Sequence, residues 1–296
     1  MDPKKLCGTF TALVTPMNRD GSLDLGALDA LVDAQLQADI DGLVPCGTTG
    51  EAVTLTPQER EQVVTRVVKR VAAKATVIAG AGANSTATAI EAQKRAASTG
   101  ADGALVVTPY YNKPSPEGLY RHYAAITEAV DFPTVLYNVP SRTGCDMKPD
   151  TVARVSKLPG VVGIKEATGD IDRVAAIRDK TAKSFVLLSG DDATACPFVL
   201  LGGDGVISVA SNVAPSEMKA MIRAAAEGKV APARAQHDRL RALFVALFLE
   251  ANPIPVKAAL HLLGRLEESY RLPLCGMSKE PRARLETVLR EGGWLH

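Results

Sequence analysis

VVGIKEA, at residues 161–167, is a short and mostly apolar run with one lysine, Lys165, near its C-terminal end. Seven other short runs recur along the chain, and most are rich in β-branched residues without strict polar–apolar alternation. That pattern is typical of strands buried on both faces of a parallel sheet. The other runs are TFTALVT (9–15), DGLVPC (41–46), TVIAGA (76–81), GALVVT (103–108), TVLYNV (134–139), FVLLSG (185–190) and GVISVA (205–210).

Amphipathic segments with helix start signals separate these runs. One begins with Thr56 as N-cap, Pro57 at the first helical position and Glu59 three residues after the cap, and Ser85 and Ser115 begin two others. Eight strand–helix repeats predict an α/β fold, a closed (β/α)8 TIM barrel with additional C-terminal helices. A doubly wound open sheet is the alternative, disfavoured because no GxGxxG follows the first run. We assign residues 1–213 to the barrel strands and most barrel helices, and residues 214–296 to the last barrel helix and the C-terminal extension.

Composition excludes several classes of function. The chain has 296 residues, of which 46% are hydrophobic and 23% charged, and its formal net charge is +1. Without a basic tail or a long apolar run, neither nucleic acid nor a membrane is an expected partner. The five cysteines form no CxxC pair and no signal-peptide pattern is present, so we expect a cytoplasmic location. The four histidines lie far apart without HxxxH or HExxH spacing, and no metal site is expected.

Lys165 is the residue of the sequence that most specifically indicates catalytic chemistry. Most lysines are solvated, but this one lies in a strand expected to be buried on both faces. Alternation places Val161, Gly163 and Lys165 on one side of the strand, and Glu166 on the other, in the strand–helix layer. A buried lysine either pairs with an acid or loses its proton, and the neutral amine attacks carbonyl carbons. Because barrel enzymes keep their active sites at the C-terminal ends of the strands, Lys165 is the candidate nucleophile.

Three further candidates follow strands at the same end of the barrel. GTTGE (47–51) has two glycines that permit a tight turn, in which the amides of Thr48 and Thr49 can face an anion; an ordinary turn is the alternative. Tyr137 ends the fifth run and is either a reactive phenol or a packed barrel aromatic. Arg142 follows in a loop with proline and glycine, where it either stays solvated or binds a carboxylate bidentately.

Two other segments are candidates for the rim of the site. Tyr110 and Tyr111 are adjacent in TPYYNKPSPEG (108–118), so an extended loop would direct them to opposite sides. Two aromatics in a polar loop indicate an interface or a lid, with surface packing as the alternative. Ile207 and Ser208, near the end of the eighth run, can offer backbone groups to a small-molecule pocket.

Together these motifs resemble the dihydrodipicolinate synthase and N-acetylneuraminate lyase family. The resemblance covers nearly the whole chain, and GTTGE combined with YNVPSRTG resembles the synthase branch rather than the sialic-acid lyases. It implies a cofactor-free enzyme that condenses pyruvate, held as a lysine Schiff base, with L-aspartate-4-semialdehyde in the diaminopimelate route to lysine. The matching segments are TALVTPM, GTTGE, VVTPYYNKPS, LYNVPSRTG, GIKEATG, LLSGDD, GGDGVISV and NPIPVKAAL.

The resemblance also implies roles for individual residues. Lys165 would form the imine, and a proton relay would connect Thr49, Tyr137 and Tyr111, with Tyr111 supplied by a neighbouring subunit. A homo-oligomer, by resemblance a dimer of dimers, is therefore expected. The binding roles implied are pyruvate carboxylate at the Thr48 and Thr49 amides, aspartate semialdehyde carboxylate at Arg142, and a backbone carbonyl near the lysine from Ile207.

Other functions remain open at this point. A pyruvate aldolase for a sugar acid could use the same scaffold, but Arg142 argues against a pocket selective for hydroxyl groups. A non-catalytic sensor could dispense with Lys165 or Tyr137, and a metal-dependent barrel aldolase would need a ligand cluster. Many family members also bind lysine at a dimer interface, where this chain has Thr88 in place of a glutamate and Arg60 in place of a histidine. We therefore expect lysine inhibition to be weak or absent.

Overall fold

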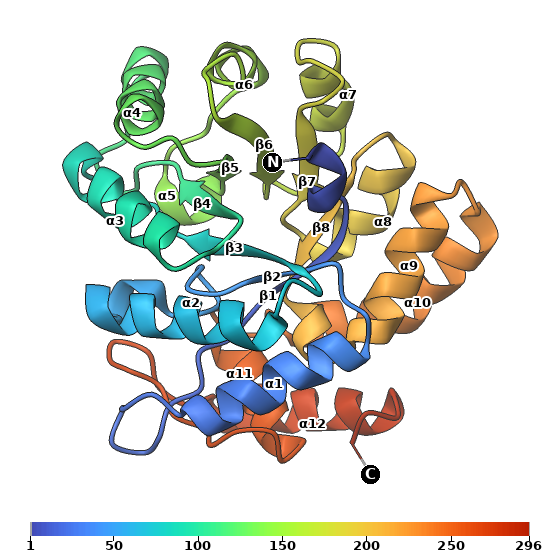
Figure 1. The fold of residues 1–296 in the computed structure, drawn as a ribbon. Coiled ribbons are helices and arrows are strands. Elements are labelled where there is room, and N and C mark those ends of the chain that lie inside the picture. The colour runs from blue at the N-terminus through green and yellow to red at the C-terminus, as the bar shows by residue number, and fades with distance from the viewer. Residues whose placement is uncertain (1, 296) are drawn as a thin grey trace.

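The computed structural model describes residues 2–295 and shows a closed barrel of eight parallel strands in sequence order (Figure 1). Each strand pairs with its neighbours in the chain, and β1 closes the barrel by pairing with β8. The predicted (β/α)8 fold is therefore confirmed. The strands are β1 (Gly8–Ala12), β2 (Gly42–Val44), β3 (Thr76–Gly80), β4 (Gly103–Val107), β5 (Thr134–Asn138), β6 (Val161–Glu166), β7 (Val186–Ser189) and β8 (Gly205–Ser208).

Helices surround the barrel and begin where the sequence predicts. Thr56 and Glu59 form the expected capping box on α2, and Ser85 and Ser115 cap α3 and α4 with their hydroxyl groups. The α-helices are α1 (Leu25–Gln37), α2 (Pro57–Val71), α3 (Thr86–Ser98), α4 (Pro116–Ala129), α5 (Pro140–Thr143), α6 (Pro149–Val155), α7 (Asp172–Arg178), α8 (Asp192–Leu200), α9 (Pro215–Ala226), α10 (Val230–Ala246), α11 (Ile254–Leu262) and α12 (Lys279–Glu291). Three 3₁₀ helices complete the set, η1 (Pro3–Leu6), η2 (Ala52–Thr54) and η3 (Ala210–Asn212).

Two apolar cores arise from the two faces of the strands. The barrel interior is filled by side chains such as Phe10, Ile78 and Leu188, joined by Leu6 from η1. The larger core lies between the strands and the surrounding helices. Since every strand is covered on both faces, its sequence reads as a continuous apolar run rather than an alternating one.

The strand that carries Lys165 departs from the predicted alternation at its first residue. Thr134 of β5 pairs with Val161, but the next residue, Val135, pairs with Gly163, so Val162 is an extra residue in β6. As a result Val161 packs in the outer core and Val162 contacts the barrel interior. The prediction that Val161 shares the side of Gly163 and Lys165 is therefore wrong, because a bulge shifts the side-chain order by one residue.

Beyond the bulge, a buried ionic network holds the C-terminal ends of β5 and β6. Arg173 of α7 donates to Glu166 (3.1 Å) and to Asp146 (2.8 and 2.7 Å), and the Asn138 side chain donates to Glu166 (3.0 Å). Glu166 is therefore fixed in the strand–helix layer, as predicted. Because successive side chains of a strand point to opposite faces, anchoring Glu166 outward directs Lys165 inward.

We expect Arg173→Leu to lower the free energy of unfolding by roughly 3–5 kcal/mol, because it leaves the Glu166 charge buried without its partner. The matched control is Arg95→Leu, which removes an exposed pair with Glu61 and should cost about 0–1 kcal/mol. Equilibrium denaturant unfolding of both variants measures the difference. Equal effects of the two substitutions would contradict the structural role of Arg173.

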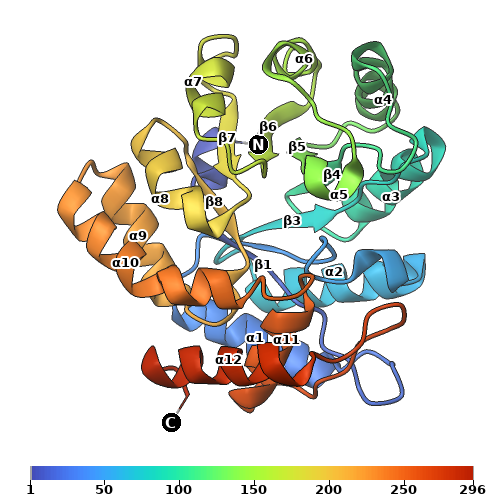
Figure 2. The same ribbon diagram turned by 180° about the vertical axis from the view of Figure 1, so that it is seen from behind.

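The C-terminal helices pack on one side of the barrel. The helix α12 packs against α10 and α11, and both views show α10 next to α9 (Figure 2). The breaks between them fall at Gly228, Asn252-Pro253 and the segment around Pro273, as predicted. The division at residues 213 and 214 stays a prediction; β8 ends at Ser208 and α9 begins at Pro215 on either side of it. Within residues 2–295, no helix has the length and apolarity needed to cross a membrane.

Candidate active site

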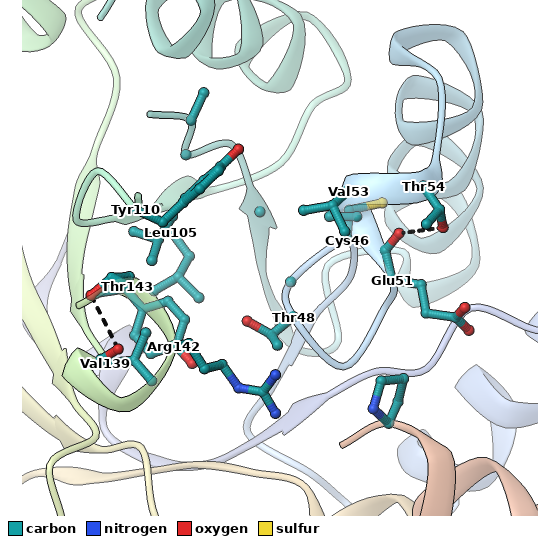
Figure 3. Close-up of a pocket in the computed structure, with 18 of the residues that line it drawn as sticks. Cys46, Thr48, Glu51, Val53, Thr54, Leu105, Tyr110, Val139, Arg142 and Thr143 are labelled. Carbon is teal, nitrogen blue, oxygen red and sulfur yellow. Dashed lines mark hydrogen bonds between the residues drawn. The ribbon is translucent and has the colours of Figure 1, made fainter. Parts of the chain in front are cut away.

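A cavity of about 410 Å³ opens where the loops after the C-terminal ends of the strands meet. Its wall includes Thr48 after β2, Tyr110 after β4, Tyr137 on β5 and Arg142 on α5, together with Asn252 before α11. Figure 3 shows the Arg142 guanidinium extending across the cavity towards the loop that carries Thr48. Four residues singled out from the sequence, Thr48, Tyr110, Tyr137 and Arg142, therefore come together at one end of the barrel.

The loop after β2 presents two free backbone donors. The amides of Thr48 and Thr49 donate to no group among residues 2–295, while Glu51 N closes the turn on the Thr48 carbonyl (3.1 Å). The turn differs from expectation in its conformation. Its left-handed residues are Cys46 (φ 56°) and Glu51 (φ 53°), not the glycines, and Gly50 is needed because a Cβ there would lie 3.0 Å from the Cys46 nitrogen. Adjacent unpaired amides of this kind form a site for an anion.

Lys165 and Tyr137 lie side by side on neighbouring strands. They are register partners of β6 and β5, and the Lys165 Nζ is 4.4 Å from the centroid of the Tyr137 ring. Lys165 is only 6% exposed, and no carboxylate within residues 2–295 forms an ion pair with its amine. The sequence left open whether an acid pairs with this lysine, and among the described residues none does.

Arg142 reaches the cavity from the first turn after β5. Its Nη2 donates to the backbone carbonyl of Asn252 (3.1 Å), which fixes the side chain against the segment before α11. The remaining N–H groups of the guanidinium face the open cavity, where they can bind a carboxylate.

Several sequence candidates are not part of the cavity wall, namely Lys165, Thr49, Tyr111 and Ile207. Tyr111 is 89% exposed with φ 73°, while its neighbour Tyr110 lines the cavity, so the two rings do project to different sides. Ile207 is buried in the barrel interior on β8. Within one chain, therefore, Tyr111 does not join Lys165, Tyr137 and Thr49.

Sequence reasoning missed several residues that shape the site. Asn252 donates from Nδ2 to the Thr49 hydroxyl (3.0 Å), and Lys257 of α11 forms an ion pair with Glu51 in which both side chains are 0% exposed. Gly190 was also missed; a Cβ there would lie 2.9 Å from the Lys165 Cε. A signal for Lys257 was present, because it stands alone in the apolar run IPVKAAL (254–260), as Lys165 does in its own run.

Cys46 borders the same loop but is unsuited to nucleophilic chemistry. Burial raises the pKa of its thiol to about 12, so the thiolate is scarce near neutral pH. Within residues 2–295, no group of three or more His, Cys, Asp or Glu side chains is arranged to hold a metal ion.

Comparison with known proteins assigns this chain to a family. The sequence profile of the Dihydrodipicolinate synthetase family matches residues 5–292. The chain belongs to this family. A curated 4-hydroxy-tetrahydrodipicolinate synthase of Methylococcus capsulatus is 52% identical over 97% of this chain and 99% of its own length.

Solved structures of the family superpose closely on this chain. The chloride-inhibited dihydrodipicolinate synthase of Acinetobacter baumannii, complexed with pyruvate, is 44% identical with a TM-score of 0.96, over 98% of this chain and 99% of its own. The enzyme of Cyanidioschyzon merolae with lysine bound is 42% identical with a TM-score of 0.95, over 98% of this chain and 99% of its own. The predicted resemblance and the predicted activity, that of a Schiff-base-forming lyase of lysine biosynthesis, are confirmed.

Proposed function

We propose that this chain performs the 4-hydroxy-tetrahydrodipicolinate synthase reaction with Lys165 as the imine-forming amine, pyruvate as the first substrate and L-aspartate-4-semialdehyde as the second. The observation that carries the proposal is the buried, unpaired amine of Lys165 beside the ring of Tyr137. The neutral amine is the form that attacks a ketone, and no carboxylate within residues 2–295 holds the Lys165 amine in an ion pair.

In the proposed reaction the Lys165 nitrogen attacks the ketone carbon of pyruvate, and water leaves from the carbinolamine to give an imine. Loss of a methyl proton gives the enamine, whose carbon forms a bond with the aldehyde carbon of the second substrate. The amino nitrogen of that substrate then attacks the imine carbon and displaces Lys165, which closes the ring and regenerates the free amine. Tyr137 would move protons through these steps, since a neutral phenol can both donate and accept.

The remaining residues would bind the substrates. The free amides of Thr48 and Thr49 would hold the pyruvate carboxylate, and Arg142 would bind the carboxylate of aspartate semialdehyde. Ile207 would contribute its backbone carbonyl near the lysine. Thr49 would pass protons between Tyr137 and Tyr111 of a neighbouring chain. This requires a homo-oligomer, which we propose to be a dimer of dimers. The proposed location is the reducing cytoplasm, and the five free cysteines are consistent with it.

Direct assay tests this function. Protein mixed with pyruvate and L-aspartate-4-semialdehyde should consume both substrates and release the cyclic product, detected by its mass. If the semialdehyde were replaced by an aldose such as N-acetylmannosamine, no condensation is expected. Turnover with the sugar and none with the semialdehyde would instead establish the sugar-acid aldolase alternative.

Arg142→Ala should lower kcat/KM for aspartate semialdehyde by about 10- to 100-fold, because a charge-assisted bidentate contact contributes on the order of 1.5–3 kcal/mol. Imine formation with pyruvate should change much less. Arg142→Lys is the matched control, since it keeps the charge and loses the bidentate geometry. Its kcat/KM for aspartate semialdehyde should lie between those of the unmodified protein and Arg142→Ala. Steady-state kinetics with each substrate varied in turn gives the comparison. Equal damage to both half-reactions would argue against this role for Arg142.

Lysine should inhibit this chain weakly or not at all. The same cavity is lined by Arg60, Thr88 and Tyr110. Free lysine bound beside them would lie near the Arg60 cation, although its ammonium groups need anionic or carbonyl partners. Replacing a carboxylate by the Thr88 hydroxyl removes a charge-assisted hydrogen bond, a loss on the order of 2–4 kcal/mol or about 30- to 1000-fold in affinity. An assay across millimolar lysine measures this, with Thr88→Glu combined with Arg60→His as the variant expected to gain sensitivity. Clear inhibition of the unmodified chain below about 1 mM would contradict the prediction.

A further inference from the structure

Asn252 forms hydrogen bonds with two residues of the candidate active site, Arg142 and Thr49. Its backbone carbonyl accepts from Arg142 Nη2 (3.1 Å), and its side-chain Nδ2 donates to the Thr49 hydroxyl oxygen (3.0 Å). The residue is 6% exposed and lines the cavity. Its contact with Arg142 therefore survives any change of side chain, whereas its contact with Thr49 does not.

The segment that carries Asn252 holds the loop after β2 at two points. Besides the Asn252–Thr49 hydrogen bond, Lys257 pairs with Glu51, and both of these charged side chains are fully buried. The partners are separated by more than 200 residues in the chain. These two contacts fix the segment that carries Asn252 relative to the loop that carries Thr49.

The Asn252 amide makes one hydrogen bond, and that bond goes to Thr49. Its Oδ1 is buried and has no partner within residues 2–295. Among the described residues, Thr49 is therefore the one hydrogen-bond partner of the Asn252 side-chain amide.

We propose that Asn252 is a positioning residue that sets the direction of the Thr49 hydroxyl. A hydroxyl has one proton to donate and two lone pairs to accept with. When the Asn252 amide occupies a lone pair, the Thr49 proton is directed elsewhere and is available to Tyr137 in the proton relay. An acceptor at this position would take the Thr49 proton and reverse the relay. This inference rests on the proposed function, in which Thr49 and Tyr137 exchange protons.

Asn252→Asp tests the proposal because it keeps the shape and exchanges the donor for an acceptor. Above the pKa of the new carboxyl group, kcat for condensation should fall on the order of 100-fold, the low end of the range for losing a proton-transfer group. As the pH falls through that pKa, the protonated carboxyl can donate to Thr49 again, and the ratio of variant to unmodified kcat should rise. For Asn252→Ala the ratio should be lowered and independent of pH. Thermal melting at each pH verifies that both variants are folded under assay conditions.

A double-mutant cycle with Thr49→Val separates positioning from packing. Valine has no hydroxyl to orient, so neither Asn252→Asp nor Asn252→Ala should lower kcat further in that background. A carboxylate acting merely as a charge near Arg142, or a packing defect, would lower kcat to the same extent in both backgrounds and overturn the proposal. If Asn252→Asp does not fold, the comparison of kcat for Asn252→Ala in the unmodified and Thr49→Val backgrounds tests the proposal in its place. Failure of the proposed function is distinct, since the unmodified chain would then condense nothing.

Discussion

Lys165→Ala is expected to lower condensing activity by about 10³-fold or more while the protein stays folded, because the side chain that would carry the covalent intermediate is gone. The substitution removes a buried amine that forms no ion pair within the described residues, so no charge is left without its partner. Lys165→Arg is the matched control. It keeps a cation at this position, but a guanidinium does not lose its proton and cannot form an imine.

Both Lys165 variants should therefore be inactive, with circular dichroism spectra like that of the unmodified protein. Steady-state turnover of pyruvate and aspartate semialdehyde measures the loss. Substantial activity in Lys165→Arg would mean that the residue acts through its charge, and the Schiff-base role would have to be abandoned. Activity retained in Lys165→Ala would move the nucleophile elsewhere.

Tyr111→Phe is expected to reduce kcat by roughly 10²–10⁴-fold, the usual range for loss of a proton-transfer group. This would occur although Tyr111 is 89% exposed and does not line the cavity of its own chain. The proposed oligomer would bring this ring to the neighbour's Thr49 and Tyr137.

Complementation distinguishes action on the neighbour from action within one chain. Tyr111→Phe and Lys165→Ala chains, each poor alone, should recover activity when refolded together, since one site of each mixed dimer would combine an intact Lys165 with an intact Tyr111. The control is a chain carrying both substitutions, refolded with itself, which should stay inactive. If mixed oligomers form, as shown by two affinity tags, and no activity returns, Tyr111 does not act on the neighbouring site.

Local patterns in the sequence were sufficient to predict the barrel. Runs buried on both faces give strands, and caps such as Thr56 with Glu59 give helix starts, because both depend on residues close together in the chain. The bulge at Val162 was not predictable in this way, since it is set by the pairing of β6 with β5. The left-handed conformations of Cys46 and Glu51 were missed because glycines stood nearby and are the usual residues there.

The site candidates named from the sequence follow or end strands, whereas two of the residues that the sequence analysis missed come from the C-terminal segment and a third, Gly190, follows β7. The active-site end of a TIM barrel follows from the fold class, since it lies at the C-terminal ends of the strands. Five candidates follow or end strands there: Lys165, Tyr137, Thr48, Thr49 and Arg142. Asn252 and Lys257 reach the loop after β2 from more than 200 residues away, and periodicity carries no information on such a contact. The proposed place of Tyr111 in the site would depend on a second chain, which the fold of one chain does not supply.

Borohydride reduction in the presence of pyruvate is the most direct test of the central claim that Lys165 carries the substrate as an imine. Reduction converts the imine to a stable secondary amine, so the adduct can be located by peptide mass mapping. We expect a single pyruvate-derived adduct on Lys165, absent when pyruvate is omitted and absent from Lys165→Arg. An adduct on another lysine such as Lys257, or no adduct under conditions of full turnover, would contradict it.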